Sequence, residues 1–519
     1  MSLPSPLPDA LDANHPDRFF DVGYLKKDLK RRTVRGGALT VGSEVIKQAF
    51  WLVSTVVLAR LLSPSDNGLI AMAVILTGFI NLFTDLGLSA ATIQRAQINH
   101  QQASTLFWIN VATSIGLALI TAASAPLVAA FYGDPRLLPI TLVLATGFVL
   151  GGLTVQHKAL LKRQMRFNIL IRIDIASAAF STMMGIAAAF AGFGYWSLVV
   201  IKLSGAPIEI IATYLAVRWR PGRPVWGDSV RSLVVFGGNL TGYRIVNYLV
   251  RNVDNLLIGR FYGPLQLGLY AKAYSLLMLP LQRINAPIGS VAIPTLSRLV
   301  NQPERYRQAY TNIQSKVCLA TMPMVAFMVA TSDWLVLVLL GPQWVEAGPI
   351  FAWLGISGLI EPFAFTTIWL FLTQNRTRQQ FYWGLISSSL MISSMVLGLP
   401  WGPVGVAMSY SIVSVCIRMP ILFWYVGREG HVRTHHLYAA LLPFACIVSA
   451  VLLSIYGFRQ LVGAINPLVG LLGASIITAV VSLLILLALP TGRTILREAK
   501  SLPGLLFNRK SLPDLATKE

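Results

Sequence analysis

The sequence predicts an all-α integral membrane protein with about 14 transmembrane helices, forming two pseudo-symmetric six-helix lobes and two extra C-terminal helices. Three observations lead to this fold class. The composition is strongly apolar, apolar segments of helical length follow one another along the chain, and a direct repeat relates the first half of the sequence to the second.

The composition indicates a protein that lies within a lipid bilayer. Of 519 residues, 55% are hydrophobic and 12% are charged, whereas a soluble domain carries about 25% charged residues. The net charge of +21 is a feature of nucleic-acid-binding proteins, but here the charges lie between apolar segments, so no nucleic acid is expected. The three cysteines lie inside apolar segments without the spacing of a metal or disulfide site.

Residues 1–36 are polar and then basic, and they are expected to form a cytoplasmic N-terminal tail. No apolar core precedes a cleavage site in this region, so it does not resemble a secretory signal peptide. Its stretch FFDVGYLKKDLK could alternatively lie on the membrane surface as a short amphipathic helix.

Apolar segments of about 20 residues or more follow the tail, and each is long enough to cross the hydrocarbon core as a helix. We place them at 37–60, 67–92, 103–130, 137–157, 167–191, 195–217, 232–258, 268–293, 315–340, 348–373, 381–398, 403–426, 437–457 and 466–489.

The distribution of basic residues predicts the orientation of these spans. With the N-terminus inside, 29 of the 42 Lys and Arg residues lie in inside loops and tails, and four lie in outside loops. Because cytoplasmic loops of membrane proteins are enriched in Lys and Arg, both termini are expected in the cytoplasm. The span number is then even, and residues 490–519 form a cytoplasmic tail.

A direct repeat divides the chain into two lobes. VLARLLSPSDNGLIA, which begins at Val57, lies over LLIGRFYGPLQLGLYA, which begins at Leu256. Further on, GDPRLLPITLV resembles GPQWVEAGPIF, and GFGYWSLVV resembles PWGPVGVAM. A repeat of parallel halves is typical of transporters. We therefore predict an N-lobe at 37–217, a cytoplasmic linker at 218–231 and a C-lobe at 232–426, with the spans in 437–489 outside the repeat.

A polar stripe runs through the second copy of this repeat, between Tyr243 and Lys272. Its members are spaced i, i+3, i+4, i+7 and i+11, which places them on one face of a helix. They are Arg244, Asn247, Tyr248, Arg251 and Asn255. The equivalent positions in the first copy, 200 residues earlier in the sequence, are Glu44, Lys47, Gln48, Trp51 and Thr55. Charges at membrane depth are costly, so such a stripe indicates a functional site.

The long ordered stretches from about 37 to 430 resemble the polysaccharide transporter branch of the MATE-like exporters (the MOP superfamily), which includes Wzx-type flippases. The resemblance rests on VLARLLSPSDNGLIAMAVILTGFINLFTDLGLSAATIQR, on GFGYWSLV and on NVDNLLIGRFYGPLQLGLYAKAYSLLMLPLQRINAPIGSVAIPTLSRL. It implies two six-helix lobes around a central cavity, alternating access, and an undecaprenyl-diphosphate-linked oligosaccharide as substrate in the bacterial inner membrane. Such a transporter serves exopolysaccharide, capsule or O-antigen synthesis.

A surplus of cations within the predicted spans suits a cavity that receives a diphosphate, because guanidinium and ammonium groups bind phosphate oxygens. We predict that the cavity is lined by Lys47, Arg244, Arg251, Lys272 and Arg283. A structural alternative pairs Arg251 with Asp254, three residues later. Acids in apolar surroundings are candidates for ion coupling, and these are Asp85, Asp254 and Glu361.

Two other functions remain as alternatives. A drug exporter of the same superfamily would favour acidic cavity residues, and a polysaccharide polymerase or ligase would need a sizeable outside loop. All predicted loops are short and contain no Walker A motif, so a transporter is expected rather than an enzyme, without a cofactor or metal. Expected partners are membrane lipids and, as candidates, proteins that polymerise the polysaccharide or set its chain length.

Overall fold

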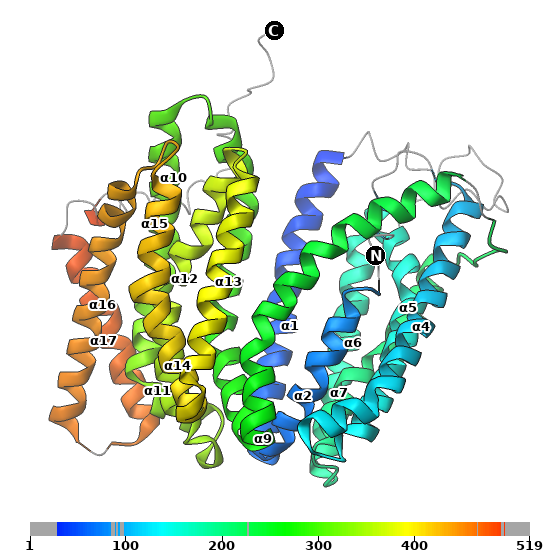
Figure 1. Cartoon of the computed structure of the whole chain (residues 1–519), viewed down its shortest axis with the longest axis horizontal. Coiled ribbons are helices and arrows are strands. Elements are labelled where there is room, and N and C mark those ends of the chain that lie inside the picture. Colours follow the sequence, from blue (N-terminus) through cyan, green and yellow to red (C-terminus); the bar gives the residue numbers. More distant parts are fainter. Residues whose placement is uncertain are drawn as a thin grey trace, which may run out of the picture. The chain divides into compact units, whose positions relative to one another are not determined.

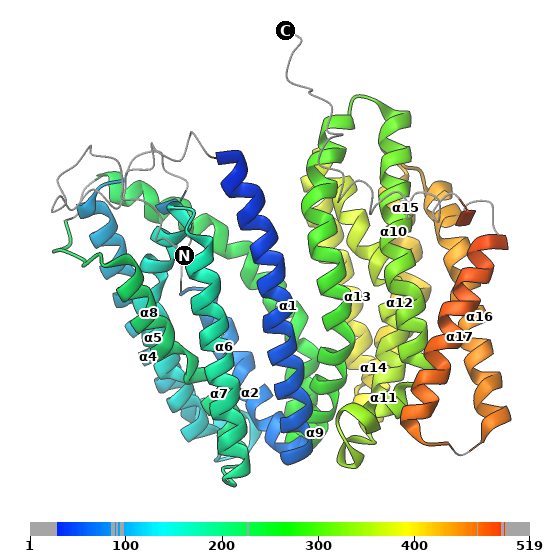
Figure 2. The same ribbon diagram turned by 180° about the vertical axis from the view of Figure 1, so that it is seen from behind.

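The computed structural model describes residues 29–84, 89, 92–93, 98–225, 228–463, 465–488 and 492–493. These residues form helices and no strand, which confirms the predicted all-α class (Figure 1, Figure 2). The chain divides into two compact units, Met1–Gly268 and Leu269–Glu519, and each is described by itself.

The structure is that of a multi-pass membrane protein. Ten helical segments among the described residues are long and apolar enough to cross a membrane. Two of them, Arg251–Leu299 and Thr377–Gly427, contain 49 and 51 residues. At about 1.5 Å per residue, each is more than twice as long as the roughly 30 Å hydrocarbon core is thick. Inside a bilayer a helix satisfies its own backbone hydrogen bonds, which accounts for the absence of strands from the described residues.

The described residues of the first unit form seven complete helices and the first part of an eighth. They are α1 (Leu29–Leu61), α2 (Pro64–Asn81), α4 (His100–Tyr132), α5 (Leu137–Arg163), α6 (Phe167–Phe190), α7 (Trp196–Leu203), α8 (Gly205–Val217) and α9 (Asp228–Leu299). Helix α4 packs along α5, while α6 lies against α1, α7 and α8 (Figure 2). Phe107, Leu160 and Trp219 belong to an apolar core at one end of this unit.

Local sequence determines where several of these helices begin. Ser63 caps α2 by accepting a hydrogen bond from the Asp66 N–H, and the Asp66 carboxylate accepts one from the Ser63 N–H in return. Pro64, at the first helical position, has no N–H to leave unpaired. Asn99 and Gln102 form the same reciprocal cap at the start of α4. Such caps satisfy backbone donors that a helix start leaves free.

The second unit contains the rest of α9 and the helices that follow it. They are α10 (Pro303–Ala330), α11 (Ser332–Leu339), η3 (Pro342–Trp344), α12 (Ala347–Thr373), α13 (Thr377–Gly398), η4 (Leu399–Trp401), α14 (Gly402–Val413), η5 (Ser414–Arg418), α15 (Met419–Gly427), α16 (Thr434–Val462) and α17 (Pro467–Ala488). Helix α10 lies against α12 and α16, and α16 pairs with α17 (Figure 1). The core between them includes Phe363, Phe423 and Phe444.

Glycines bring the two copies of the sequence repeat into close contact. Helix α9 breaks at Gly263, whose φ of 76° and ψ of −176° are accessible to glycine alone. Beyond the break, a Cβ atom on Gly68 would lie 1.7 Å from the carbonyl oxygen of Pro264. Reciprocally, a Cβ atom on Gly268 would lie 1.9 Å from the carbonyl oxygen of Pro64. The start of α2 and the chain after Gly263 therefore approach backbone to backbone.

A second pair of equivalent positions appears where α5 and α12 end. Met165 and Asn375 have positive φ angles of 53° and 57°, and an arginine follows each of them. The Arg166 Nη1 donates to the Ala216 carbonyl at 3.1 Å, and the Arg376 Nη1 donates to the Val426 carbonyl at 3.1 Å. Each arginine thus ties one interhelical turn to the end of a later helix in its own unit.

Candidate functional site

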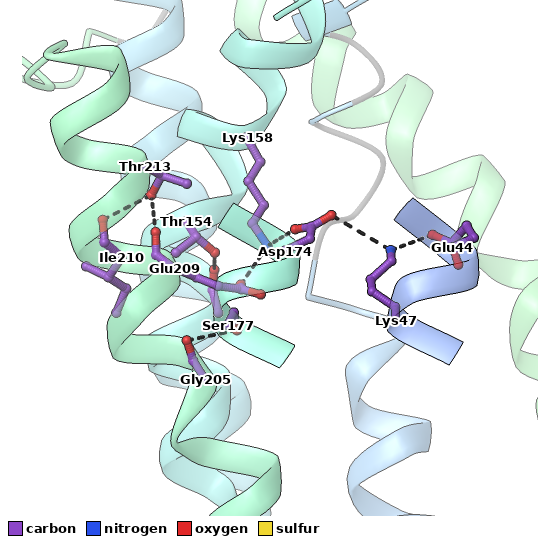
Figure 3. Close-up of polar contacts among 11 residues, drawn as sticks. Glu44, Lys47, Thr154, Lys158, Asp174, Ser177, Gly205, Glu209, Ile210 and Thr213 are labelled. Atoms are coloured by element: carbon purple, nitrogen blue, oxygen red, sulfur yellow. Dashed lines mark hydrogen bonds and ion pairs between the residues drawn. The ribbon is translucent and has the colours of Figure 1, made fainter. Parts of the chain in front are cut away.

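Five charged side chains from four helices of the first unit form a connected network, called here the charge cluster (Figure 3). Its members are Glu44 and Lys47 on α1, Lys158 on α5, Asp174 on α6 and Glu209 on α8. Lys47 forms an ion pair with Glu44, one turn earlier on the same helix. Its Nζ also lies 3.9 Å from Asp174 Oδ2. The Lys158 Nζ lies 3.9 Å from Asp174 Oδ1 and 2.6 Å from Glu209 Oε2.

Close packing of α8 on α6 helps to place Glu209 in the cluster. Helix α7 ends at Leu203 and α8 begins at Gly205. The Ser177 hydroxyl of α6 donates to the Gly205 carbonyl at 3.1 Å, and a Cβ atom on Gly205 would lie 2.5 Å from the Ser177 Oγ. Because the two helices are this close, the Glu209 carboxylate, one turn further along α8, reaches Lys158 (Figure 3).

The cluster combines strong charge with partial access. Its three carboxylates and two ammonium groups lie on helices of a membrane protein, where an uncompensated charge costs roughly 2.5–3.5 kcal/mol. Mutual pairing offsets that cost. The side chains are nevertheless 25–38% exposed, so a ligand can reach them. Partly accessible lysines held by carboxylates can bind an anionic ligand when they exchange one partner for another.

The predicted cavity and coupling residues of the first unit have different environments. Lys47 belongs to the charge cluster, where it contacts acids from two helices. The Arg251 side chain is exposed. Asp254 is 3% exposed, and its Oδ1 accepts a hydrogen bond from the Asn255 N–H at 2.7 Å. Asp85 and the side chain of Arg244 lie outside the described residues.

The remaining predicted residues belong to the second unit. The Lys272 Nζ lies 5.9 Å from the ring centroid of Trp344, which is fully buried. This distance allows a cation–π contact. Arg283 is exposed on α9, and Glu361 is half-buried on α12. Their roles in substrate binding or ion coupling stay predictions.

Three members of the charge cluster are absent from the set predicted by sequence. The sequence assigns Lys158 to an inside loop, whereas α5 continues as a helix to Arg163. It also leaves Asp174 and Glu209 without a role. These residues come from three separate helices, so periodicity within one segment does not place them together. The signal that could have found them is their type, since ionisable residues inside an apolar span indicate function.

Comparisons with known proteins agree on the family of this chain. The family model described as "Polysaccharide biosynthesis protein" matches residues 57–349. The teichuronic acid biosynthesis protein TuaB of Bacillus subtilis is 28% identical, over 65% of this chain and 71% of its own length. The lipopolysaccharide biosynthesis protein WzxC of Escherichia coli is 24% identical, over 75% and 79%. The succinoglycan biosynthesis transport protein ExoT of Rhizobium meliloti is 26% identical, over 72% and 76%.

Solved structures agree with this result at the level of the fold. The lipid II flippase MurJ, in an inward closed conformation, matches with a TM-score of 0.68 and 13% identity, over 87% of this chain and 98% of its own. An inward-facing multidrug resistance MATE transporter of the MOP superfamily matches with a TM-score of 0.59 and 13% identity, over 76% and 96%. The family model covers more than half of the sequence, and the chain therefore belongs to the polysaccharide biosynthesis protein family.

Proposed function

We propose that this protein is a flippase that moves an undecaprenyl-diphosphate-linked oligosaccharide across the bacterial inner membrane. The relatives named above support this proposal, because their names refer to teichuronic acid, lipopolysaccharide and succinoglycan biosynthesis, and one is named a transport protein. The product would serve exopolysaccharide, capsule or O-antigen synthesis.

The family match over residues 57–349 is the observation that carries the proposal, and the charge cluster contains two cations that suit the substrate. A lipid-linked sugar presents the membrane with a diphosphate, which needs cations inside the bilayer region to offset its desolvation. Lys47 and Lys158 hold two ammonium groups on α1 and α5, within reach of one carboxylate of α6. We assign Arg244, Arg251, Lys272 and Arg283 as further cations along the substrate's path. The polyprenyl tail stays in the lipid.

The transport cycle that fits this substrate is alternating access by two six-helix lobes around a central cavity. Fourteen spans are compatible with the helices present. The two segments of 49 and 51 residues can each supply two spans, and α1 and α2 lie outside the ten candidate spans. Helices α16 and α17, which are among the ten candidate spans, would be the last two of the fourteen. Both termini would then lie in the cytoplasm.

Ion coupling forms a separate part of the proposal. Glu361, half-buried on α12, Asp254, buried on α9, and Asp85 are the acids that could take up a proton or Na⁺ as the cavity reopens. The test is transport in vesicles after both ion gradients are collapsed. A loss of transport is expected, and unchanged transport would remove coupling from the scheme.

Gene deletion tests the proposed function and separates it from the alternatives. A flippase mutant should lose surface polysaccharide and accumulate the complete lipid-linked oligosaccharide on the inner leaflet. A drug exporter mutant should instead become sensitive to cationic drugs while its polysaccharide stays normal. A polymerase mutant should export single repeat units without joining them. Either of the last two outcomes would refute the flippase assignment.

A further inference from the structure

The Asp174 carboxylate occupies an unusual position between two lysines of different helices. Each of its oxygens faces one ammonium group, Oδ2 toward Lys47 of α1 and Oδ1 toward Lys158 of α5 (Figure 3). Both distances are 3.9 Å, which is close enough for electrostatic attraction but longer than a hydrogen bond. Asp174 therefore attracts both lysines and is hydrogen-bonded to neither.

Each lysine has a second, closer carboxylate that sets its position. Lys47 pairs with Glu44 on its own helix, and Lys158 Nζ lies 2.6 Å from Glu209 Oε2. Lys162, one turn after Lys158, also interacts electrostatically with Asp174. The lysines would therefore stay in place if Asp174 were replaced by another anion.

We propose that Asp174 is a displaceable counter-ion, and that the substrate diphosphate takes its place between Lys47 and Lys158. This inference rests on the proposed function and deepens it, since it adds Lys158 and Asp174 to the substrate site. A diphosphate carries more charge than a carboxylate and offers more oxygens. It can accept short, charge-assisted hydrogen bonds from both ammonium groups, which Asp174 does not do.

Such a counter-ion has two consequences for transport. In the empty protein it attracts the lysines of α1 and α5 toward one another, in addition to their closer partners Glu44 and Glu209. In the loaded protein it competes with the substrate for the same lysines, which lowers affinity and promotes release after the lobes have moved. Asp174 is thus a positioning residue that sets the balance between binding and release.

The test compares binding and turnover in the full-length protein reconstituted in lipid nanodiscs and proteoliposomes. With undecaprenyl diphosphate as the probe, Asp174→Asn should bind about fivefold more tightly, the factor that corresponds to roughly 1 kcal/mol for a partly exposed ion pair. Its flipping rate at saturating probe should fall. If Asp174 had only a structural role, Asp174→Asn would change probe binding and the flipping rate only by lowering the stability of the protein.

Two further variants make the result decisive. Asp134→Asn is the control, because it removes a carboxylate from an ion pair with Arg136 between α4 and α5, outside the charge cluster, and should leave probe binding unchanged. If Asp174→Asn does not accumulate, Asp174→Glu tests the opposite direction. Its longer side chain should contact both lysines more closely and weaken binding of undecaprenyl diphosphate.

The outcomes distinguish this inference from the proposed function. If the wild-type protein neither binds nor flips the probe, the flippase assignment itself fails. If the wild type binds the probe but folded Asp174→Asn binds no more tightly, Asp174 is not a competing counter-ion and only this inference is overturned. If Asp174→Asn binds more tightly and turns over more slowly, the inference is supported.

Discussion

For a single residue such as Lys158, the ion pair with Glu209 must be separated experimentally from any role in substrate binding. The pair is close, at 2.6 Å, and about a quarter of each side chain is exposed. Removing one partner leaves a partly buried charge without close compensation. A single substitution can therefore abolish transport by destabilising the protein, without any loss of substrate binding. A double variant that removes both partners is the control for this effect.

We expect Lys158→Met to abolish transport and lower stability, because it leaves Glu209 without its close partner, at a cost of up to roughly 2.5–3.5 kcal/mol. The double variant Lys158→Met with Glu209→Gln should recover thermal stability in detergent without recovering surface polysaccharide. Full export by this double variant would mean that the pair only holds α5 and α8 together.

The close approach of the repeat copies leads to a second prediction at this scale. In Gly68→Ala the new methyl group would meet the Pro264 carbonyl oxygen, whose position is 1.7 Å from an ideal Cβ. We expect a large fall in the melting temperature of the purified protein. Gly116→Ala, on α4, is a matched control because no atom lies within 4 Å of its Cβ position. That control should be neutral or more stable by about 0.5–1 kcal/mol. Equal melting temperatures for the two variants would contradict the close packing.

At the scale of elements, the sequence repeat predicts equivalent turns better than it predicts the site. The loops KALLKRQMRF and TQNRTRQQF follow at similar distances along the two copies of the repeat. Both contain a residue with positive φ followed by an arginine, Arg166 or Arg376, that donates to the end of a later helix. The charge cluster was not predictable in this way. Lys158, Asp174 and Glu209 lie on three helices, and α6 packs against α8 through the close contact of Ser177 with Gly205.

Arg166 and Arg376 should stabilise their turns to different extents. Arg376 donates to the carbonyls of Val426 and Glu429, at 3.1 and 2.6 Å, whereas Arg166 donates to Ala216 at 3.1 Å. Burial of Arg376 lowers the pKa of its guanidinium, and the nearby Glu429 opposes that shift.

We therefore expect Arg376→Ala to destabilise the protein by about 1–3 kcal/mol, the cost of leaving the buried Val426 carbonyl unpaired, and Arg166→Ala by less. Hydrogen exchange in the turns at 164–166 and 374–376 measures both. A larger effect from Arg166→Ala would show that the contacts of the two arginines do not set the stability of these turns.

At the scale of the whole molecule, the positive-inside distribution predicts the topology. Reporter fusions at 133 and 400 should read as periplasmic, and fusions at 225 and 305 as cytoplasmic, because 29 Lys and Arg residues lie on the predicted inner side and four on the outer side. A periplasmic reading at 225 would refute the proposed order of spans.

The proposed function requires this protein to carry a diphosphate-linked sugar lipid across the membrane past Lys47 and Lys158. Purified protein in proteoliposomes, loaded with an undecaprenyl-diphosphate-linked oligosaccharide, tests it most directly. We predict that the wild type moves the lipid between leaflets. Two folded variants should not do so, namely the single variant Lys47→Ala and the double variant Lys158→Met with Glu209→Gln. Undiminished flipping by both variants would remove these lysines from the substrate's path, and no flipping by the wild type would refute the proposed function.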